Sequence, residues 1–267
     1  MPLSLLEGLC RAELDAISRL KPHEYSRVIR QGAGGDFTKM IDLVAEEAAV
    51  AYLESIGFEG RLLSEELGEK KFGNADFPLL VLDPVDGTTN ASRGISFYSI
   101  SIAEAWGSML SDVRAGMVME LPTGRVFSSE KGQGSLLDGV AFTSPTPVDL
   151  GEALVGIDSN VVGNREKLMA LVPLCLRIKH SRNLGSAAMG LCYAANGALD
   201  LYVDNRGFLR VTDIAAACLI LRESGGSVLD LEGKDLNCRL SLDERVALVA
   251  GPRKTCLESL GLIQKSY

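Results

Sequence analysis

Residues 79–90 read Leu79-Leu80-Val81-Leu82-Asp83-Pro84-Val85-Asp86-Gly87-Thr88-Thr89-Asn90. The four consecutive aliphatic residues at the start predict a strand that is buried on both faces of a sheet. The carboxylates of Asp83 and Asp86 come directly after it, and Pro84 stiffens the turn between them. Gly87 allows the backbone to approach closely, and Thr88 predicts the start of a helix. This stretch therefore predicts two acids at the end of a strand, next to a helix N-terminus.

This arrangement of charges favours one kind of chemistry. Two carboxylates so close together repel each other, and a hard divalent cation with oxygen ligands would balance them. The N-terminus of the helix that begins near Thr88 is suited to an anion, because its backbone N–H groups lack partners within the helix. A metal and an anion at one place predict phosphoryl chemistry.

The stretch also resembles the signature of the inositol monophosphatase and fructose-1,6-bisphosphatase superfamily, which are magnesium-dependent sugar-phosphate phosphatases. The resemblance implies a layered α/β fold, an α-β-α-β-α sandwich. It implies the dual-specificity branch found in archaea and bacteria. It covers nearly the whole chain, and its matches come in order at Asp42, Glu65, residues 83–88, residues 185–188 and Asp213.

The resemblance implies two or three Mg²⁺ ions in each site. Glu65, Asp83 and the main-chain carbonyl of Val85 would hold the first ion. Asp83, Asp86 and Asp213 would hold the second, and a third, weaker ion would be bound through Glu65 and water. Two of these ions would bridge the phosphate and activate the attacking water.

Three residues have implied catalytic roles. Asp42 and Thr88 would orient or deprotonate the attacking water, and Glu65 would act through its metal ion. The usual family spacing is Thr-x-x-Asp, whereas Thr38 lies one residue further from Asp42. Asp42 therefore matches the pattern better than Thr38 does.

The paired acids Glu65 and Glu66 follow a predicted short strand over residues 61–64. Neighbouring side chains on an extended segment point to opposite sides. One of the two is therefore expected to face the site, and the other to face solvent or a cation.

The segment before Asp42 is rich in glycine. Residues 31–36 are expected to form a flexible loop, with Asp36 as the N-cap of a helix from residue 37 to about residue 56. Residues 31–39 are expected to act as a lid over the site.

The phosphate and the leaving group have separate implied contacts. The amides of Gly87 and Thr88 would hold phosphate oxygens beside Asp86. Gly185 and Ser186 open a helix that Gly197 closes, and its N-terminal amides could receive a hydroxyl or a phosphate.

Ala187, Arg182 and Arg206 would contact the sugar or its second phosphate. An Arg suits a second phosphate because its guanidinium can bind two oxygens at once. Asp213 is expected in the first turn of a helix that runs to about residue 223. Thr212 stands before it where the family normally has Trp.

The sequence predicts two lobes that meet near Ser144-Pro145-Thr146-Pro147. Residues 1–146 would form an α+β lobe with most of the metal ligands. Residues 147–267 would form an α/β lobe with the substrate contacts and the last metal ligand. A chain of 267 residues with 46% hydrophobic content can bury a core of this size.

Composition excludes several classes of protein. The net charge is −8 and there is no Lys/Arg-rich run, which argues against nucleic-acid binding. No apolar run approaches membrane length, so no membrane association is expected. The six scattered cysteines predict free thiols rather than disulfides or a zinc site. A cytoplasmic protein is expected, and the resemblance implies a homodimer.

The leading hypothesis is a Mg²⁺-dependent phosphatase that acts on inositol-1-phosphate, fructose-1,6-bisphosphate or both, by attack of a metal-activated water. Two alternatives stay open at this point. One is a nucleotidase of the same superfamily that acts on 3′-phosphoadenosine 5′-phosphate. The other is a non-catalytic protein that senses a phosphate or a metal on an enzyme-like fold.

Overall fold

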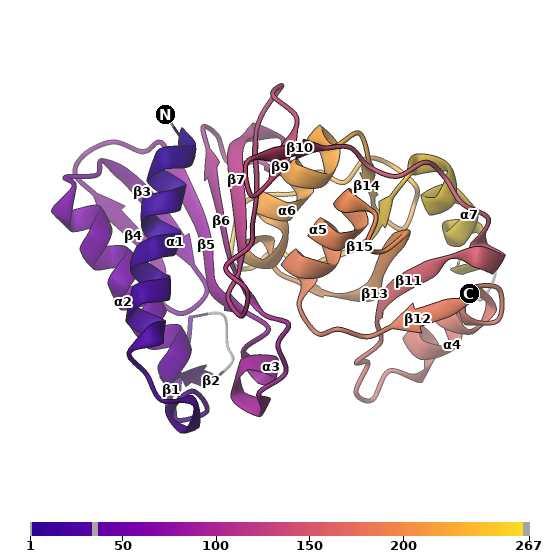
Figure 1. The fold of residues 1–267 in the computed structure, drawn as a ribbon, viewed down its shortest axis with the longest axis horizontal. Coiled ribbons are helices and arrows are strands. Elements are labelled where there is room, and N and C mark those ends of the chain that lie inside the picture. The colour runs from indigo at the N-terminus through magenta and orange to yellow at the C-terminus, as the bar shows by residue number, and fades with distance from the viewer. Residues whose placement is uncertain (1, 34–36, 264–267) are drawn as a thin grey trace.

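The computed structural model describes residues 2–33 and 37–263 (Figure 1). Within these residues the α-helices are α1 (Pro2–Ser18), α2 (Met40–Ser55), α3 (Thr88–Arg93), α4 (Arg165–Cys175), α5 (Ala187–Asn196), α6 (Val211–Glu223) and α7 (Arg253–Ile263). Short 3-10 turns are η1 (Pro22–Glu24), η2 (Leu110–Asp112) and η3 (Leu150–Glu152).

Most strands belong to two large sheets. The 8-stranded sheet has the order β10-β9-β8-β7-β6-β5-β3-β4 and the 5-stranded sheet has the order β12-β11-β13-β15-β14. The first sheet contains β3 (Gly60–Ser64), β4 (Gly68–Phe72), β5 (Leu79–Asp86), β6 (Ser99–Ala105), β7 (Val113–Glu120), β8 (Val126–Glu130), β9 (Ser135–Leu137) and β10 (Val140–Phe142). The second contains β11 (Leu154–Asp158), β12 (His180–Arg182), β13 (Leu201–Leu209), β14 (Ser227–Leu229) and β15 (Val246–Gly251). A separate pair is formed by β1 (Val28–Gln31) and β2 (Phe37–Lys39).

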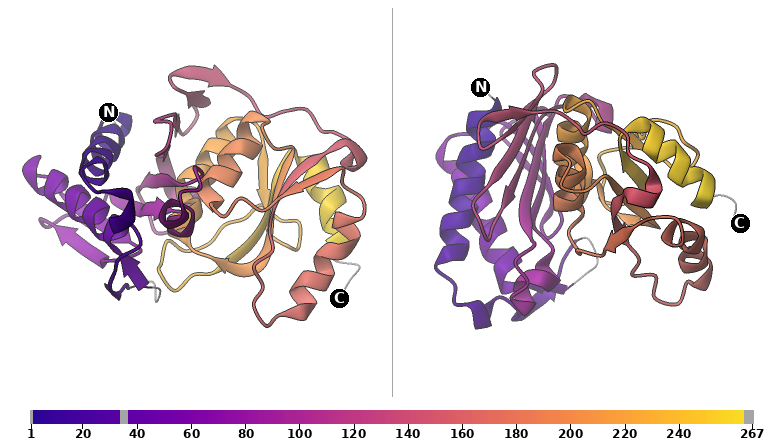
Figure 2. Two further views of the ribbon diagram at one scale, coloured as in Figure 1. Left: turned by 60° about the horizontal axis from the view of Figure 1, so that its bottom comes forward. Right: turned by 45° about the vertical axis from the view of Figure 1, so that its right-hand side comes forward.

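The elements stack in five layers (Figures 1 and 2). Helices α1 and α2 cover one face of the 8-stranded sheet, and α5 and α6 lie between the two sheets. Helices α4 and α7 cover the remaining face of the 5-stranded sheet. Three buried apolar clusters fill the interfaces between the layers, and the one around α5 and α6 includes residues of both sheets. The predicted α-β-α-β-α sandwich is confirmed.

Strand β5 occupies the interior, as the aliphatic run predicts. All eight of its residues are buried. Leu80 and Leu82 pack in the cluster on the α1 and α2 side, whereas Val81 packs in the cluster around α5 and α6. The strand extends past the predicted four aliphatic residues, and its pairing with β6 is irregular between Asp83 and Asp86.

The turn after β5 requires glycine. Gly87 has φ 93° and forms the N-cap of α3. A Cβ at this position would lie 3.1 Å from the carbonyl oxygen of Phe97, which is closer than side chains normally approach. Gly87 therefore lets the backbone turn tightly beside the two acids.

The start of α2 differs from the prediction. Residues 37–39 pair with β1 as strand β2, and the helix begins at Met40. Lys39 is extended, and its backbone N–H donates to the Asp42 carboxylate at 3.0 Å. Asp42 therefore caps its own helix. The predicted N-cap Asp36 lies outside the described residues, and the predicted lid over residues 31–39 is described only in part.

The strands of the two sheets come from different parts of the chain. The 8-stranded sheet ends at residue 142 and the 5-stranded sheet begins at residue 154. Helices α5 and α6 from the second part share one apolar cluster with the first sheet. The division into lobes at residue 146 stays a proposal.

Two expectations from composition, on membrane-spanning segments and on the cysteines, can be compared with the structure. Among the described residues, none of the helices has the length and apolar character needed to span a bilayer. The six cysteines are all described and all free, and only Cys175 is exposed. The prediction of free thiols is confirmed.

Candidate active site

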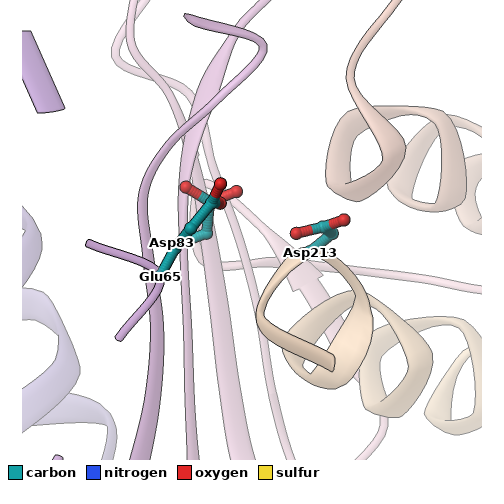
Figure 3. Close-up of side chains that lie close together, drawn as sticks. All are labelled: Glu65, Asp83 and Asp213. Atoms are coloured by element: carbon teal, nitrogen blue, oxygen red, sulfur yellow. The ribbon is translucent and has the colours of Figure 1, made fainter. Parts of the chain in front are cut away.

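Three carboxylates from distant parts of the chain converge at one edge of the 8-stranded sheet (Figure 3). Glu65, Asp83 and Asp213 each offer an oxygen, and these atoms lie within 4.8 Å of one another. Ser64 pairs with Leu82 in the parallel strands β3 and β5. Glu65 and Asp83 are the next residues along the two segments, so they lie side by side. Asp213 approaches from the first turn of α6.

The strand period explains why the two sheet acids point toward α6. Leu63 and Val81 pack in the apolar cluster that contains α6. Glu65 and Asp83 are each two residues further along, so they are expected on the same face. The sequence prediction that these acids lie together is supported by this geometry.

The cluster is electrostatically unfavourable without a cation. Burial, followed by the charge of Asp213, raises the pKa of Glu65 to about 8. Burial, followed by the charge of Glu65, raises the pKa of Asp83 well above its usual range. Burial also raises the pKa of Asp213. Oxygen-only donors that repel one another in this way fit a hard divalent ion such as Mg²⁺.

Arg210 is part of the site, and sequence reasoning missed it. Its Nη1 lies 2.8 Å from Oε1 of Glu65. Its backbone N–H donates to Oδ2 of Asp213 at 3.0 Å. The only signal in the sequence is its place three residues before Asp213, which is the spacing of a capping contact.

Asp86 lies in the same cavity but is held by α5. Its Oδ2 accepts hydrogen bonds from Oγ of Ser186 at 2.6 Å and from the backbone N–H of Ala188 at 2.7 Å. Burial, followed by the charge of Asp213, raises its pKa to about 7. Its predicted role as a ligand of a second ion stays a prediction.

Asp42 and Thr88 are in contact. Oγ1 of Thr88 lies 2.9 Å from Oδ1 of Asp42 and 2.9 Å from the carbonyl oxygen of Val85. Burial is the main cause that raises the pKa of Asp42 to about 7. The main-chain carbonyl of Val85, a predicted metal ligand, therefore lies next to the predicted water-orienting pair.

Glu66 also lines this cavity. It is buried, and the Thr38 hydroxyl donates a hydrogen bond to its carboxylate. The expectation that the second acid faces solvent is wrong, because Glu66 is buried. The alternative that it faces a cation stays a prediction. The contact gives the buried Thr38 a structural partner.

Two adjoining cavities contain most of the predicted residues. The larger has a volume of about 470 Å³ and the smaller about 330 Å³. Both are lined by Asp86, Thr89, Gly185, Arg206 and Asp213. The larger adds Phe37, Lys39, Asp42, Glu65, Glu66, Asp83, Val85, Gly87, Thr88 and Arg210, and the smaller adds Asn90, Asp158, Asn160, Asn183, Leu184, Ala187 and Leu209.

Two predicted residues lie away from these linings. Ser186 is buried beneath them as the N-cap of α5. Arg182 lies at the end of β12 and lines a separate cavity of about 150 Å³ beside α4. Its predicted contact with substrate stays untested, and the described geometry offers it no support.

Arg206 reaches the site already paired. Its Nε lies 3.0 and 2.9 Å from the two carboxylate oxygens of Asp204, and its Nη2 lies 2.5 Å from Oδ2. The edge of the guanidinium that was expected to bind a second phosphate therefore faces a protein carboxylate.

The raised pKa values give a pH prediction for the metal-free protein. Asp42 and Asp86 titrate near 7 and Glu65 near 8 when folded, against about 4 when unfolded. Between these values the folded state binds more protons than the unfolded state, so its stability falls as pH rises. We expect the free energy of unfolding in chelator to decrease from pH 5.5 to 7.5, by at most about 1.4 kcal/mol per pH unit for each group. Urea titrations at both pH values measure this.

Added Mg²⁺ is the matched condition for that experiment. It is expected to stabilise the protein more at pH 7.5 than at pH 5.5, because protons compete with metal for carboxylates. A chelated protein that gains stability as pH rises would contradict the charge arrangement described above.

Comparisons with known proteins agree with this geometry. The model of the inositol monophosphatase family matches residues 5–264. A protein of Methanothermobacter thermautotrophicus named fructose-1,6-bisphosphatase/inositol-1-monophosphatase is 38% identical over 232 residues, which is 84% of this chain and 81% of the relative. A bifunctional NADP phosphatase/NAD kinase of Methanocaldococcus jannaschii is 35% identical over 83% of this chain but only 43% of its own length.

Solved structures share the fold. One named inositol monophosphatase-fructose 1,6 bisphosphatase has a TM-score of 0.84 at 24% identity and covers 97% of this chain and 98% of its own. A Pyrococcus horikoshii protein described as similar to inositol-1 monophosphatase has a TM-score of 0.78 at 28% identity and covers 100% of this chain and 96% of its own.

Proposed function

The chain belongs to the inositol monophosphatase family, and from this premise we propose that it hydrolyses phosphate monoesters of small sugars and polyols in a Mg²⁺-dependent reaction. The observation that carries the proposal is the convergence of Glu65, Asp83 and Asp213 within 4.8 Å. Inositol-1-phosphate and fructose-1,6-bisphosphate are the first candidate substrates, because the curated relative at 38% identity is named for both activities.

The residues that would hold the ions are Glu65, Asp83 and Asp213, with Asp86 and the carbonyl of Val85 completing the two or three sites proposed. When bound, the ions would offset the charge of the phosphate and lower the pKa of an attacking water. Arg210 pairs with Glu65, so part of the charge of the cluster is balanced by the protein itself.

Asp42 and Thr88 would position the attacking water and take its proton. A general base works best when its pKa is near the working pH, and burial brings the pKa of Asp42 to about 7. The Thr88 hydroxyl has both Asp42 and the Val85 carbonyl within 2.9 Å. It can donate to one of them while its oxygen accepts a hydrogen bond from the water.

The phosphate itself would lie over the turn at Gly87. The backbone amides of Gly87 and Thr88 would donate to its oxygens, as a tight glycine turn permits. Lys39 lines the same cavity, and its Nζ lies 3.2 Å from Oγ of Ser92. Its positive charge therefore lies at the cavity that would hold the phosphate.

A second candidate class is a nucleotide phosphate. It is favoured by the curated relatives named bifunctional NADP phosphatase/NAD kinase, of which one is 35% identical and another 30% identical. The 3′-phosphoadenosine 5′-phosphate alternative belongs to the same class. In each case the leaving group would be a ribose hydroxyl rather than a free polyol.

The test is phosphate release from a panel of substrates with and without Mg²⁺. Inositol-1-phosphate, fructose-1,6-bisphosphate, NADP and 3′-phosphoadenosine 5′-phosphate would be compared at equal concentrations. Mg²⁺-dependent release from either of the first two supports the sugar phosphatase. Release from NADP or 3′-phosphoadenosine 5′-phosphate alone would support a nucleotide phosphatase instead. Silence on all four with Mg²⁺ present supports a non-catalytic binding protein.

We also propose a cytoplasmic homodimer, with α4 at its interface. Several apolar side chains on this helix are exposed, and Leu176 at its end is 83% exposed. The others are Leu168, Met169 and Val172. Several exposed apolar side chains on one helix favour an association site there.

The dimer proposal predicts the effect of two charges on that surface. The double variant Leu168→Glu/Leu176→Glu is expected to elute as a monomer of 28.5 kDa in size-exclusion chromatography with light scattering. Val140→Glu changes an exposed apolar residue on β10 and is the matched control, with dimer expected. A wild-type protein that is monomeric at micromolar concentration would refute the proposal.

A further inference from the structure

The smaller cavity lies where the leaving group would extend from a phosphate held at the carboxylate cluster. It shares Asp86 and Asp213 with the larger cavity. Its far wall, which the larger cavity does not share, carries polar side chains from the 5-stranded sheet and the loops beside it: Asp158, Asn160 and Asn183. Arg206 lines both cavities. The apolar wall of the smaller cavity is formed by Leu184, Ala187 and Leu209. The groups that the far wall can bind determine which leaving group the site accepts. Its role as a leaving-group site rests on the proposed phosphatase function.

Asp158 is the anionic group of that far wall. It is the last residue of β11 and lies beside Asp204 in the parallel strand β13. Ligands of parallel sheets usually bind at these carboxyl ends of the strands. Asp158 is 4% exposed, and its Oδ2 accepts the Tyr202 hydroxyl at 2.6 Å.

Arg206 stands between the two carboxylates. Its guanidinium makes three contacts with Asp204, which is fully buried, and Nη2 also lies 3.5 Å from Oδ2 of Asp158. Tyr202 keeps its proton, because burial, followed by the charge of Asp158, raises its pKa well above the usual range. Two carboxyl groups therefore share this one guanidinium.

A second phosphate would add about two negative charges beside Asp158, and the nearby Arg206 is already paired with Asp204. The cost is large where water is partly excluded, because Coulomb repulsion is poorly screened there. A hydroxyl instead can donate to the Asp158 carboxylate, whose contacts with Tyr202 and Arg206 both use Oδ2. We propose that Asp158 is a specificity-determining residue. It accepts a hydrogen bond from a hydroxyl of the leaving group and selects an uncharged polyol end over one that carries a second phosphate.

The test compares inositol-1-phosphate with fructose-1,6-bisphosphate in the wild-type protein and in Asp158→Asn. The wild type is expected to have the higher kcat/KM on inositol-1-phosphate, by at least about tenfold, since charge-assisted bonds and unpaired charges have effects of this size. Asp158→Asn keeps an acceptor for Tyr202 but loses the charge. Its kcat/KM is expected to fall on inositol-1-phosphate and rise on fructose-1,6-bisphosphate, so that the ratio shifts about tenfold or more toward the bisphosphate.

Asp235→Asn is the matched control. Asp235 is exposed, pairs with Arg253 and lines neither cavity, so the ratio should stay at the wild-type value. A wild type that prefers the bisphosphate overturns the inference but leaves the phosphatase standing, and this outcome needs no variant to fold. A folded Asp158→Asn with the wild-type ratio also overturns it. Silence of the wild type on both substrates overturns the inference together with the proposed function.

Discussion

Asp213→Asn is expected to lower kcat for Mg²⁺-dependent phosphate release by at least about a thousandfold, which corresponds to about 4 kcal/mol. The substitution removes one of three carboxylates that lie within 4.8 Å of one another. The neutral amide of asparagine attracts a divalent ion less strongly than the carboxylate does. The charge of the ion is then less well placed to act on the phosphate.

The protein should remain folded, because the amide oxygen of asparagine can still accept the hydrogen bond from the backbone N–H of Arg210 that starts α6. Circular dichroism and thermal unfolding would confirm this. Asp243→Asn, at an exposed residue outside both cavity linings, is the control and should keep wild-type activity. Normal turnover by Asp213→Asn at low Mg²⁺ would remove Asp213 from the metal site.

Asp42→Asn is expected to reduce kcat by about 10²- to 10³-fold with little change in the Mg²⁺ concentration for half-maximal activity. Its one amide oxygen can still accept from the backbone N–H of Lys39, so the cap of α2 is kept, and its NH2 group then lies toward the hydroxyl oxygen of Thr88. What it cannot do is take a proton from water. The variant should also lose the acidic limb of the pH–rate profile, since that limb reports the protonation of Asp42 in the wild type.

Glu47→Gln is the control for this experiment, because Glu47 is an exposed acid on the same helix. It is expected to leave both kcat and the pH profile unchanged. An Asp42→Asn protein that retains the acidic limb would assign that limb to another group, and an unchanged kcat would exclude Asp42 as the base.

The local parts of the site could be predicted from sequence because each is encoded over a few residues. The aliphatic run before Asp83 and the glycine at residue 87 specify a buried strand and a tight turn. Asp213 at the first turn of a helix follows from helix capping and the dipole. The order of these motifs along the chain is the basis of the resemblance to the family. That resemblance in turn implies the layered fold.

The contacts between distant segments could not be predicted in this way. Nothing near Glu65 indicates that Arg210 pairs with it, or that Thr38 donates to Glu66. Strand β2 has only three residues and reads as the start of the following helix, so its pairing with β1 was missed. In each case tertiary packing decided the outcome.

One missed contact did have a sequence signal. Asp204 and Arg206 are two residues apart, and β13 is a strand, so their side chains share a face. This spacing predicts the ion pair that the structure shows. Treating Arg206 as an isolated cation led to its assignment to a second phosphate.

The most direct test of the account is a crystal structure of the protein with Mn²⁺ in place of Mg²⁺ and with inorganic phosphate, using anomalous scattering to locate the ions. We expect an ion bound by oxygens of Glu65, Asp83 or Asp213, with a further ion toward Asp86 and phosphate oxygens beside Gly87. Anomalous peaks elsewhere, or none at these carboxylates in crystals of an active preparation, would contradict it.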